Sequence, residues 1–285
     1  MTDIVDFGEF AGRWHRAASR WDALREFHDA WGYTVRPDAE RWDRWSESGH
    51  KAYVRALMHG PEADEFEGVD LTLPIPAALD EWWELPFNSF AFDARIYETN
   101  PEYPPTVRPD PSGYGVANAV PEDSDLIPPG ADRRVCVFMA ENQYCNEWGY
   151  PAAEAHEPDP RVLVSLDEDE WALQARSISE FFLQLAVQRL PHELGRSVHF
   201  YDHDVDDMEA LLTRVRAELP AFGFEPWYEL QQDAIVHGGP DVLVYDMHGD
   251  MEGVTVVGRT ARAVVDFAGR FGLDLDGVDL TEPGR

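Results

Sequence analysis

The stretch that decides the fold opens with VCVFMAENQYCNEWGY at residues 135–150, continues with EPDPRVLVS at residues 157–165 and closes with WALQARSISEFFLQLAVQRL at residues 171–190. Its first six residues are apolar on both faces of an extended chain, which indicates a buried central strand. A polar break follows, in which Asn142 is the residue that most readily takes a left-handed turn conformation. The chain then alternates polar with apolar residues, so the run predicts a β-hairpin with its tip at Asn142.

The residues after this hairpin predict another strand and a helix. The prolines in residues 157–160 exclude regular helix and central strand there, since each removes a backbone donor. Residues 161–165 predict a short β-branched strand, and Trp171 is placed in the connection that follows. Ser177 or Ser179 can cap a helix with apolar residues at helical spacing. We therefore expect an α+β domain with a mixed, mostly antiparallel sheet and packed helices.

An ordered set of residues in this stretch resembles the SUKH superfamily, which includes bacterial toxin-immunity proteins and proteins similar to a yeast cell-wall assembly regulator. The matching residues are Glu141, Asn142, Gln143, Trp148, Asp159, Pro160, Val162, Trp171, Ser179, Glu180 and Phe181. Upstream, LTLPIPAALDEWWELPFNSF at residues 71–90 resembles the family's entry, an LP-x-x-L helix that docks before the sheet. The resemblance covers residues 71–190, is extended to Gly258, and implies a SUKH-like domain that binds and does not catalyse.

The net charge restricts the kinds of partner. The chain of 285 residues carries 55 acidic and 23 basic residues, a net charge of −32, and Lys51 is its only lysine. An acidic, lysine-poor surface stays hydrated in concentrated salt, so we expect a halophilic protein in a salt-accumulating cytoplasm. Nucleic-acid binding is not expected, because it needs a basic footprint. A basic protein partner and mimicry of nucleic-acid charge both remain open.

The expected cellular compartment is inferred from the sequence of the N-terminus, from the length of the apolar runs and from the cysteines. No run of 18 apolar residues exists, and the acidic start MTDIVDFGEF has neither a basic nor an apolar signal region, so we expect no membrane partner and a cytoplasmic location. Cys136 and Cys145 fall in the predicted hairpin strands. Free thiols are the expected state in a reducing compartment, and a cross-strand disulfide is the alternative.

The remaining chain predicts a helical N-terminal extension over residues 1–70 and a SUKH-like domain over residues 71–285. A helical stripe runs from Trp14 to Trp31, and a second helix is expected from Pro37 to His59. The proline-rich residues 99–115 begin a long irregular stretch, interpreted as a mobile surface loop or a binding loop. Further elements are expected as a helix from Pro74 or Pro76 to Trp83, strands at 85–92, 195–201, 227–230, 234–237, 242–246 and 254–257, and helices at 206–219 and 260–271.

The run VHFYDHDVDD at residues 198–207 offers the alternative of catalysis. Its imidazoles and carboxylates, His199, His203, Asp202 and Asp204, could hold a divalent metal that activates water, giving a metal-dependent hydrolase. Against this, an Asp-rich helix start is ordinary in so acidic a chain. His237 and His248 are interpreted as rim or hairpin residues, and we expect no cofactor and no catalytic residue.

The expected partner-binding surface is the hairpin tip with the aromatic residues beside it: Glu141, Asn142, Gln143, Tyr144, Trp148 and Tyr150. Polar groups around an aromatic anchor are typical of recognition surfaces. The competing interpretation is a turn whose side chains cap their own backbone. From these residues and the resemblance, the hypothesis is a non-enzymatic immunity-like protein that neutralises a toxin domain by binding it, with a housekeeping interaction scaffold as an alternative.

Overall fold

The computed structural model describes residues 18–31, 68–82, 99–111, 113, 115–230, 232–248, 253–275 and 280. The chain forms two compact units whose border falls between Leu183 and Gln184. The hairpin unit holds the described residues up to Leu183 except 24–31, and the C-terminal unit holds residues 24–31 and those from Gln184 on. The expected helix at 37–59, the strand at 85–92 and much of the N-terminal extension lie outside the described residues.

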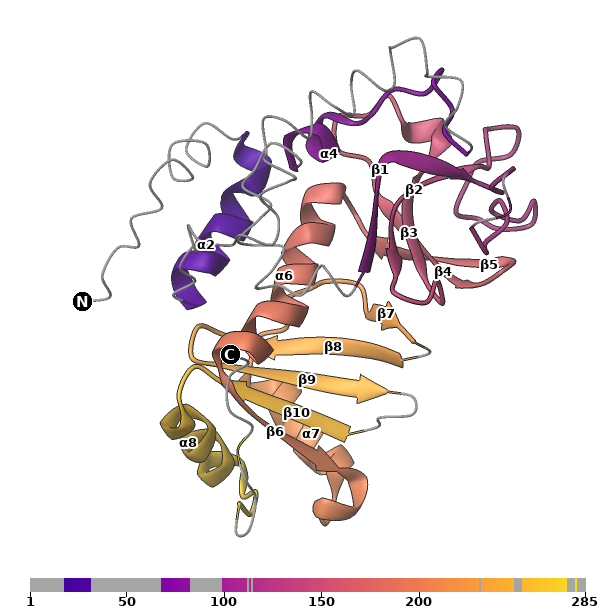
Figure 1. Cartoon of the computed structure of the whole chain (residues 1–285). Coiled ribbons are helices and arrows are strands. Elements are labelled where there is room, and N and C mark those ends of the chain that lie inside the picture. The colour runs from indigo at the N-terminus through magenta and orange to yellow at the C-terminus, as the bar shows by residue number, and fades with distance from the viewer. Residues whose placement is uncertain are drawn as a thin grey trace. The chain divides into compact units, whose positions relative to one another are not determined.

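An antiparallel sheet of five strands, in the order β1-β2-β3-β4-β5, forms the hairpin unit (Figure 1). The expected hairpin is confirmed, since β2 and β3 pair around the tip. Every pairing among the described strands is antiparallel, so the expected mixed sheet is corrected to antiparallel ones within an α+β fold. The strands are β1 (Thr99–Arg108), β2 (Val135–Glu141), β3 (Glu147–Pro151), β4 (Val162–Asp167) and β5 (Glu170–Ala175).

Two segments expected to be irregular are strands. Residues 99–108 form the edge strand β1, where the register shifts between Pro101 and Thr106. An edge strand tolerates proline because one side of its backbone needs no donor, which explains why proline content misled the prediction. Trp171 also lies in a strand, β5, and not in a connection.

Helix α6 (Ile178–Leu194) begins as expected at Ser177, whose hydroxyl accepts the backbone N–H of Glu180 at 3.1 Å. Its first turns bring Phe181 and Phe182 into an aromatic cluster. Phe182 stacks on Trp82 of the short helix α4 (Ala77–Trp82) at 3.7 Å, and Phe181 meets Phe138 of β2 edge to face at 5.2 Å. Such pairs add to the burial of large rings and fix how the helices pack.

The segment after β1 is part of a hydrophobic core. Ala117, Val120 and Ile127 are buried with Val135 and Val137 of β2. The long irregular stretch is thus packed on the sheet through this part, where we expected a mobile or binding loop. It also accounts for the apolar run from Val135 to Ala140 in β2, because the side chains on both faces of that strand are buried.

The C-terminal unit repeats the architecture with a second five-stranded sheet, in the order β6-β10-β9-β8-β7. Residues 71–285 therefore hold two sheets where one was expected, while the predicted border at residue 70 stays a prediction. The strands are β6 (Arg196–Tyr201), β7 (Trp227–Glu229), β8 (Gln232–Gly238), β9 (Val242–His248) and β10 (Gly253–Gly258). The other helices of this unit are α2 (Asp22–Trp31), α7 (Met208–Glu218) and α8 (Ala261–Phe271).

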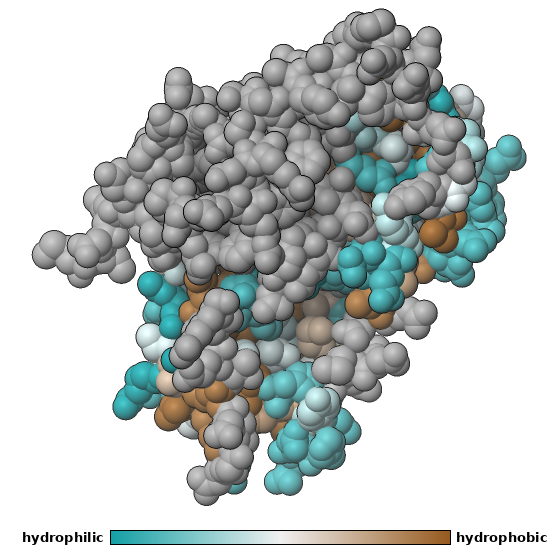
Figure 2. All heavy atoms as spheres, in the orientation of Figure 1, coloured by the Kyte–Doolittle hydropathy of each residue, from teal (hydrophilic) through white to brown (hydrophobic). Residues whose placement is uncertain are grey.

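The predicted helices of this unit begin close to where the sequence predicts, and each has a side-chain cap. Asp207 accepts the backbone N–H of Ala210 at 3.0 Å at the start of α7, and Thr260 caps α8. Both helices bury apolar side chains in one core with β6, β9 and β10. On the face shown in Figure 2, hydrophobic residues gather over α8, where Val265 is 48% exposed. Among the described helices, none has the length and apolar character needed to cross a bilayer.

Candidate functional site

The tip of the β2–β3 hairpin is closed by hydrogen bonds that converge on Glu141. Its carboxylate accepts the backbone N–H groups of Gln143 at 2.8 Å and Cys145 at 3.3 Å. Its carbonyl accepts the N–H of Tyr144 at 2.9 Å. Glu141 is only 6% exposed, so this carboxylate shapes the turn from inside, as the self-capping interpretation expects.

The left-handed residue of the turn is Tyr144, with φ of 62°, and not Asn142 as we expected. A non-glycine residue pays for this conformation, by about 1 kcal/mol or more, through the clash of its Cβ with the carbonyl. The prediction from asparagine propensity was wrong because the hydrogen bonds to Glu141 place the left-handed residue at Tyr144, two residues after Asn142. The turn therefore holds Tyr144 in a conformation that its own side chain disfavours.

The structure brings four of the six expected contact residues to the tip and places the other two in the core. Asn142 and Gln143 are exposed and Tyr144 is half-buried, beside the exposed Cys145. Trp148 is 0% exposed and Tyr150 2%, so they do not form the aromatic surface that we expected. The reason is that β3, in the middle of the sheet, is buried along its whole length. Cys145 lies in the turn and not in a strand, and both cysteines are free thiols.

The base of the tip is anchored to the neighbouring strand β4. The Asn146 side-chain amide donates to the Ser165 carbonyl at 2.7 Å, and the backbone N–H of Glu147 donates to the Ser165 hydroxyl at 2.8 Å. These groups are buried, so the bonds lie out of competition with water. The tip therefore stands on a rigid base.

A buried ion pair lies behind this base, which the sequence analysis did not detect. Arg108 is fully buried, and its Nε and Nη2 donate to one oxygen of Glu147 at 2.9 and 2.6 Å. Glu102 and Asp110 lie 3.4 and 3.8 Å from the guanidinium. The second oxygen of Glu147 accepts the backbone N–H of Ala117 at 3.0 Å, which ties the long segment after β1 to the sheet.

The pKa of Arg108 reflects two opposed effects. Burial alone would lower the pKa, but the hydrogen bonds and charge of Glu147, with the charges of Glu102 and Asp110, raise it above its ordinary value. Gly115 is required beside it, because a Cβ there would stand 2.2 Å from the Arg108 Nε. The only available sequence signal was a glycine within a proline-rich stretch, which does not point to a distant arginine.

Residues that carry the family resemblance also have structural roles. Asp159 accepts the backbone N–H of Ser179 at 3.0 Å and its hydroxyl at 2.6 Å, so the two motifs join at the start of α6. Trp171 donates from its indole to the Asn118 carbonyl at 2.9 Å. These contacts give Asp159, Ser179 and Trp171 a role in the fold, and they do not assign these residues a role in binding a partner.

The structure spreads the Asp/His run over the end of β6 and the turn after it. His199 lies in β6, with Nδ1 at 2.8 Å from the Thr255 hydroxyl, and burial lowers its pKa. Asp202, His203 and Asp204 follow in an exposed 3-10 turn. Throughout the described residues, no three His, Cys, Asp or Glu side chains come together in a way that could hold a metal ion.

A second polar cluster that the sequence analysis missed lies on β8 and β9. Asp246 is 1% exposed, and it accepts from Arg216 of α7 at 2.8 Å. His248 lies 3.4 Å from Asp246 and 2.9 Å from Asp233. His237 is buried, which lowers its pKa; it lies in the β8–β9 hairpin, as one of its two interpretations expects, and not at a rim. Strand alternation places these side chains on one face, a signal that was available in the sequence.

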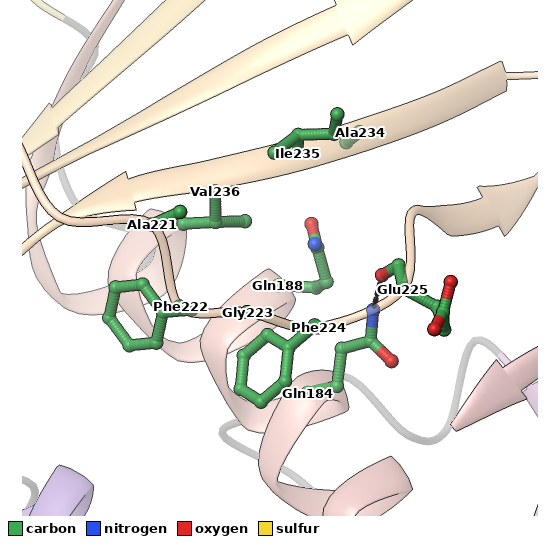
Figure 3. A pocket seen from close by; sticks show the side chains of 10 residues that line it. All are labelled: Gln184, Gln188, Ala221, Phe222, Gly223, Phe224, Glu225, Ala234, Ile235 and Val236. Atoms are coloured by element: carbon green, nitrogen blue, oxygen red, sulfur yellow. Dashed lines mark hydrogen bonds between the residues drawn. The ribbon is translucent and has the colours of Figure 1, made fainter. Parts of the chain in front are cut away.

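A small pocket lies in the C-terminal unit between α6, β8 and the segment from Ala221 to Glu225 (Figure 3). Gln184 donates from its side-chain amide to the Glu225 carbonyl at 2.6 Å and so holds this segment. The Gln188 amide lies between the segment and β8 in Figure 3. Most of the other lining side chains are apolar, so the pocket does not mark a polar ligand site.

Comparison of the chain with protein-family models, with curated proteins and with solved structures finds no match. The SUKH resemblance therefore stays a prediction, and the hairpin tip is the candidate site on geometric grounds alone.

Proposed function

We propose that this chain is a non-enzymatic protein-binding module, immunity-like in that it neutralises a basic toxin domain by binding it through the hairpin tip, residues 142–145. One observation carries the proposal: the tip is exposed, rigidly based, and holds Tyr144 in a left-handed conformation. Strained backbone that the surrounding structure enforces gathers at functional sites, where it pre-organises a surface. Pre-organisation lowers the entropy lost on binding.

Charge supports the choice of a basic partner. At a net charge of −32, the chain attracts positively charged proteins at long range. In concentrated salt this attraction acts over only a few ångströms, since the Debye length is about 3 Å at 1 M. Short-range contacts at the tip, such as those of Gln143 and Tyr144, then decide which basic protein is bound.

The exposed thiol of Cys145 provides a direct test. A photo-crosslinker is attached to Cys145, and Cys136 is replaced by serine if that thiol also reacts. The crosslinker is then activated in a lysate of the source organism at its native salt concentration. We expect one basic protein to be captured, and we expect the purified chain to block that protein's toxicity in cells. Tyr144→Gly, which keeps the turn and removes the ring, should weaken both effects.

The matched control is Leu230→Gly at the β7–β8 turn, the other described non-glycine residue at positive φ, 52°. It should leave capture and protection unchanged. The proposal fails if a crosslinker on a cysteine introduced at Asn118, in a Cys145→Ser background, captures the same proteins equally well. It also fails if the captured protein is not inhibited.

A further inference from the structure

The end of β6 presents a tyrosine ring to solvent in a fixed orientation. Tyr201 is 42% exposed, one of the few large hydrophobic side chains among the described residues that are exposed. The ring of His203 stacks on it with centroids 5.4 Å apart and planes 12° apart. On another side the ring of His199 meets it edge to face at 4.3 Å. Two imidazoles thus hold the phenol ring while much of it stays in water.

Among the described residues, the neighbouring strand places no side chain directly across from Tyr201. The cross-strand partner of Tyr201 is Gly253 of β10, which contributes no side chain. A Cβ at Gly253 would stand 2.4 Å from the Phe200 carbonyl oxygen and 3.0 Å from the His199 Nε2, so no larger residue fits. The backbone at Gly253 therefore keeps this cross-strand position without a side chain.

Three carboxylates follow Tyr201 in the exposed turn, and one of them is hydrogen-bonded to its backbone. Asp204 accepts the backbone N–H of Tyr201 at 2.9 Å, and its other oxygen lies 3.5 Å from the His203 Nε2. The side chain of Asp204 remains 42% exposed, and Asp202 and Asp206 are exposed beside it. An aromatic face next to carboxylate oxygens is the combination that a planar cation matches, through stacking and hydrogen bonds at once.

We propose that Tyr201, His203 and Asp204 bind the guanidinium group of an arginine side chain on a basic protein partner. The guanidinium stacks on the part of the Tyr201 ring that the two imidazoles leave exposed and donates to the Asp204 carboxylate. This inference rests on the proposed function, because it takes the partner to be a basic protein. It adds a contact in the C-terminal unit that prefers arginine to lysine, since an ammonium cannot stack as a plane.

The experiment uses the full chain with hexa-arginine and hexa-lysine peptides as probes, titrated by calorimetry in 1 M KCl. High salt suppresses the diffuse attraction of −32 charges, while stacking persists. We expect hexa-arginine to bind more tightly than hexa-lysine. Tyr201→Ala should weaken the affinity for hexa-arginine by about fivefold, the size of an exposed cation–π contact. It should also remove the preference for hexa-arginine over hexa-lysine. Tyr201→Phe should retain the preference for hexa-arginine, and Asp204→Asn should weaken the binding of hexa-arginine.

Tyr228→Ala is the matched control, because Tyr228 is a half-buried tyrosine with Asp233 and Glu225 nearby. It should not change binding. Equal affinity for the two peptides, or hexa-arginine binding untouched by Tyr201→Ala, would overturn the inference and leave only diffuse charge. Tyr144→Gly at the hairpin tip should not affect the peptides, so failure at the tip and failure at Tyr201 are told apart.

Discussion

At the scale of single residues, the stability of the hairpin unit is most sensitive to substitution of charged side chains that are buried away from water. Arg108 and Glu147 are both fully buried, and each is the other's closest opposite charge. Removing one partner of such a pair costs far more than the pair contributes, because an uncompensated charge remains inside. Neither residue was chosen from the sequence, since a pairing across 39 positions has no local pattern.

Glu147→Gln should lower the free energy of unfolding by about 3–5 kcal/mol, because it leaves the Arg108 guanidinium buried with weaker compensation. Urea denaturation followed by circular dichroism measures it. Glu154→Gln is the control: Glu154 pairs with Arg161 at 2.8 Å with both side chains partly exposed, and it should cost no more than about 1 kcal/mol. Equal losses in the two variants would contradict the role given to the buried pair.

His28 predicts a dependence of stability on pH. Burial lowers its pKa from 6.5 to about 3, so the folded chain keeps the ring neutral where the unfolded chain takes up a proton. Stability from this residue is complete above pH 6.5. Below that it falls by about 1.4 kcal/mol per pH unit until pH 3. Urea denaturation between pH 8 and pH 4 should show a shallower decline for His28→Leu than for the unchanged chain, and parallel curves would refute this.

At the scale of elements, the sequence predicted most strands and helices and the β2–β3 hairpin, but not the order of the strands in the two sheets. Periodicity identified β2, β3, α6, α7 and α8, because their apolar spacing and caps are local features. It missed β1, whose prolines are compatible with an edge position that only the sheet order reveals. It also placed Trp148 at the surface, since alternation along β3 does not show that a buried strand has neighbours on both sides.

The start of α6 predicts a coupled pair of substitutions. Asp159→Ala and Ser179→Ala should each cost about 1–2 kcal/mol, the usual range for lost helix caps. The double variant should cost about as much as Asp159→Ala alone, because Asp159→Ala removes both hydrogen bonds, and the one that Ser179→Ala removes, from the hydroxyl, is among them. Asp159→Ala combined with Asp132→Ala, which removes a different contact, to Arg134, should instead be additive. Additive losses in the first pair would contradict a shared cap.

At the scale of the whole molecule, charge is the property that the sequence alone determines. With 55 acidic and 23 basic residues, repulsion among carboxylates opposes the compact state at low ionic strength. The ion pairs that the structure shows around Arg134, Arg189 and Arg216 relieve only part of it. The position of the candidate site could not be predicted to the same degree, since exposure depends on packing between distant segments.

The melting temperature should rise steeply with KCl from 0.05 M to about 1 M and flatten above it, because screening is nearly complete once the Debye length reaches about 3 Å. Differential scanning calorimetry measures it, with sucrose at equal osmolality as the uncharged control. Sucrose should give a shallow and even rise. A melting temperature that does not respond to KCl below 1 M would show that carboxylate repulsion does not limit stability.

The border between the two compact units lies inside a single helix, between Leu183 and Gln184 of α6. A recombination event that exchanged genes at this border would leave each descendant with a truncated helix, and neither fragment would bury the apolar positions it had inherited. Inheritance should therefore respect the ends of α6, with viable crossovers at Gly195 or before Ser177. Helix α6 is expected to have been inherited whole, whichever half of the protein it accompanied.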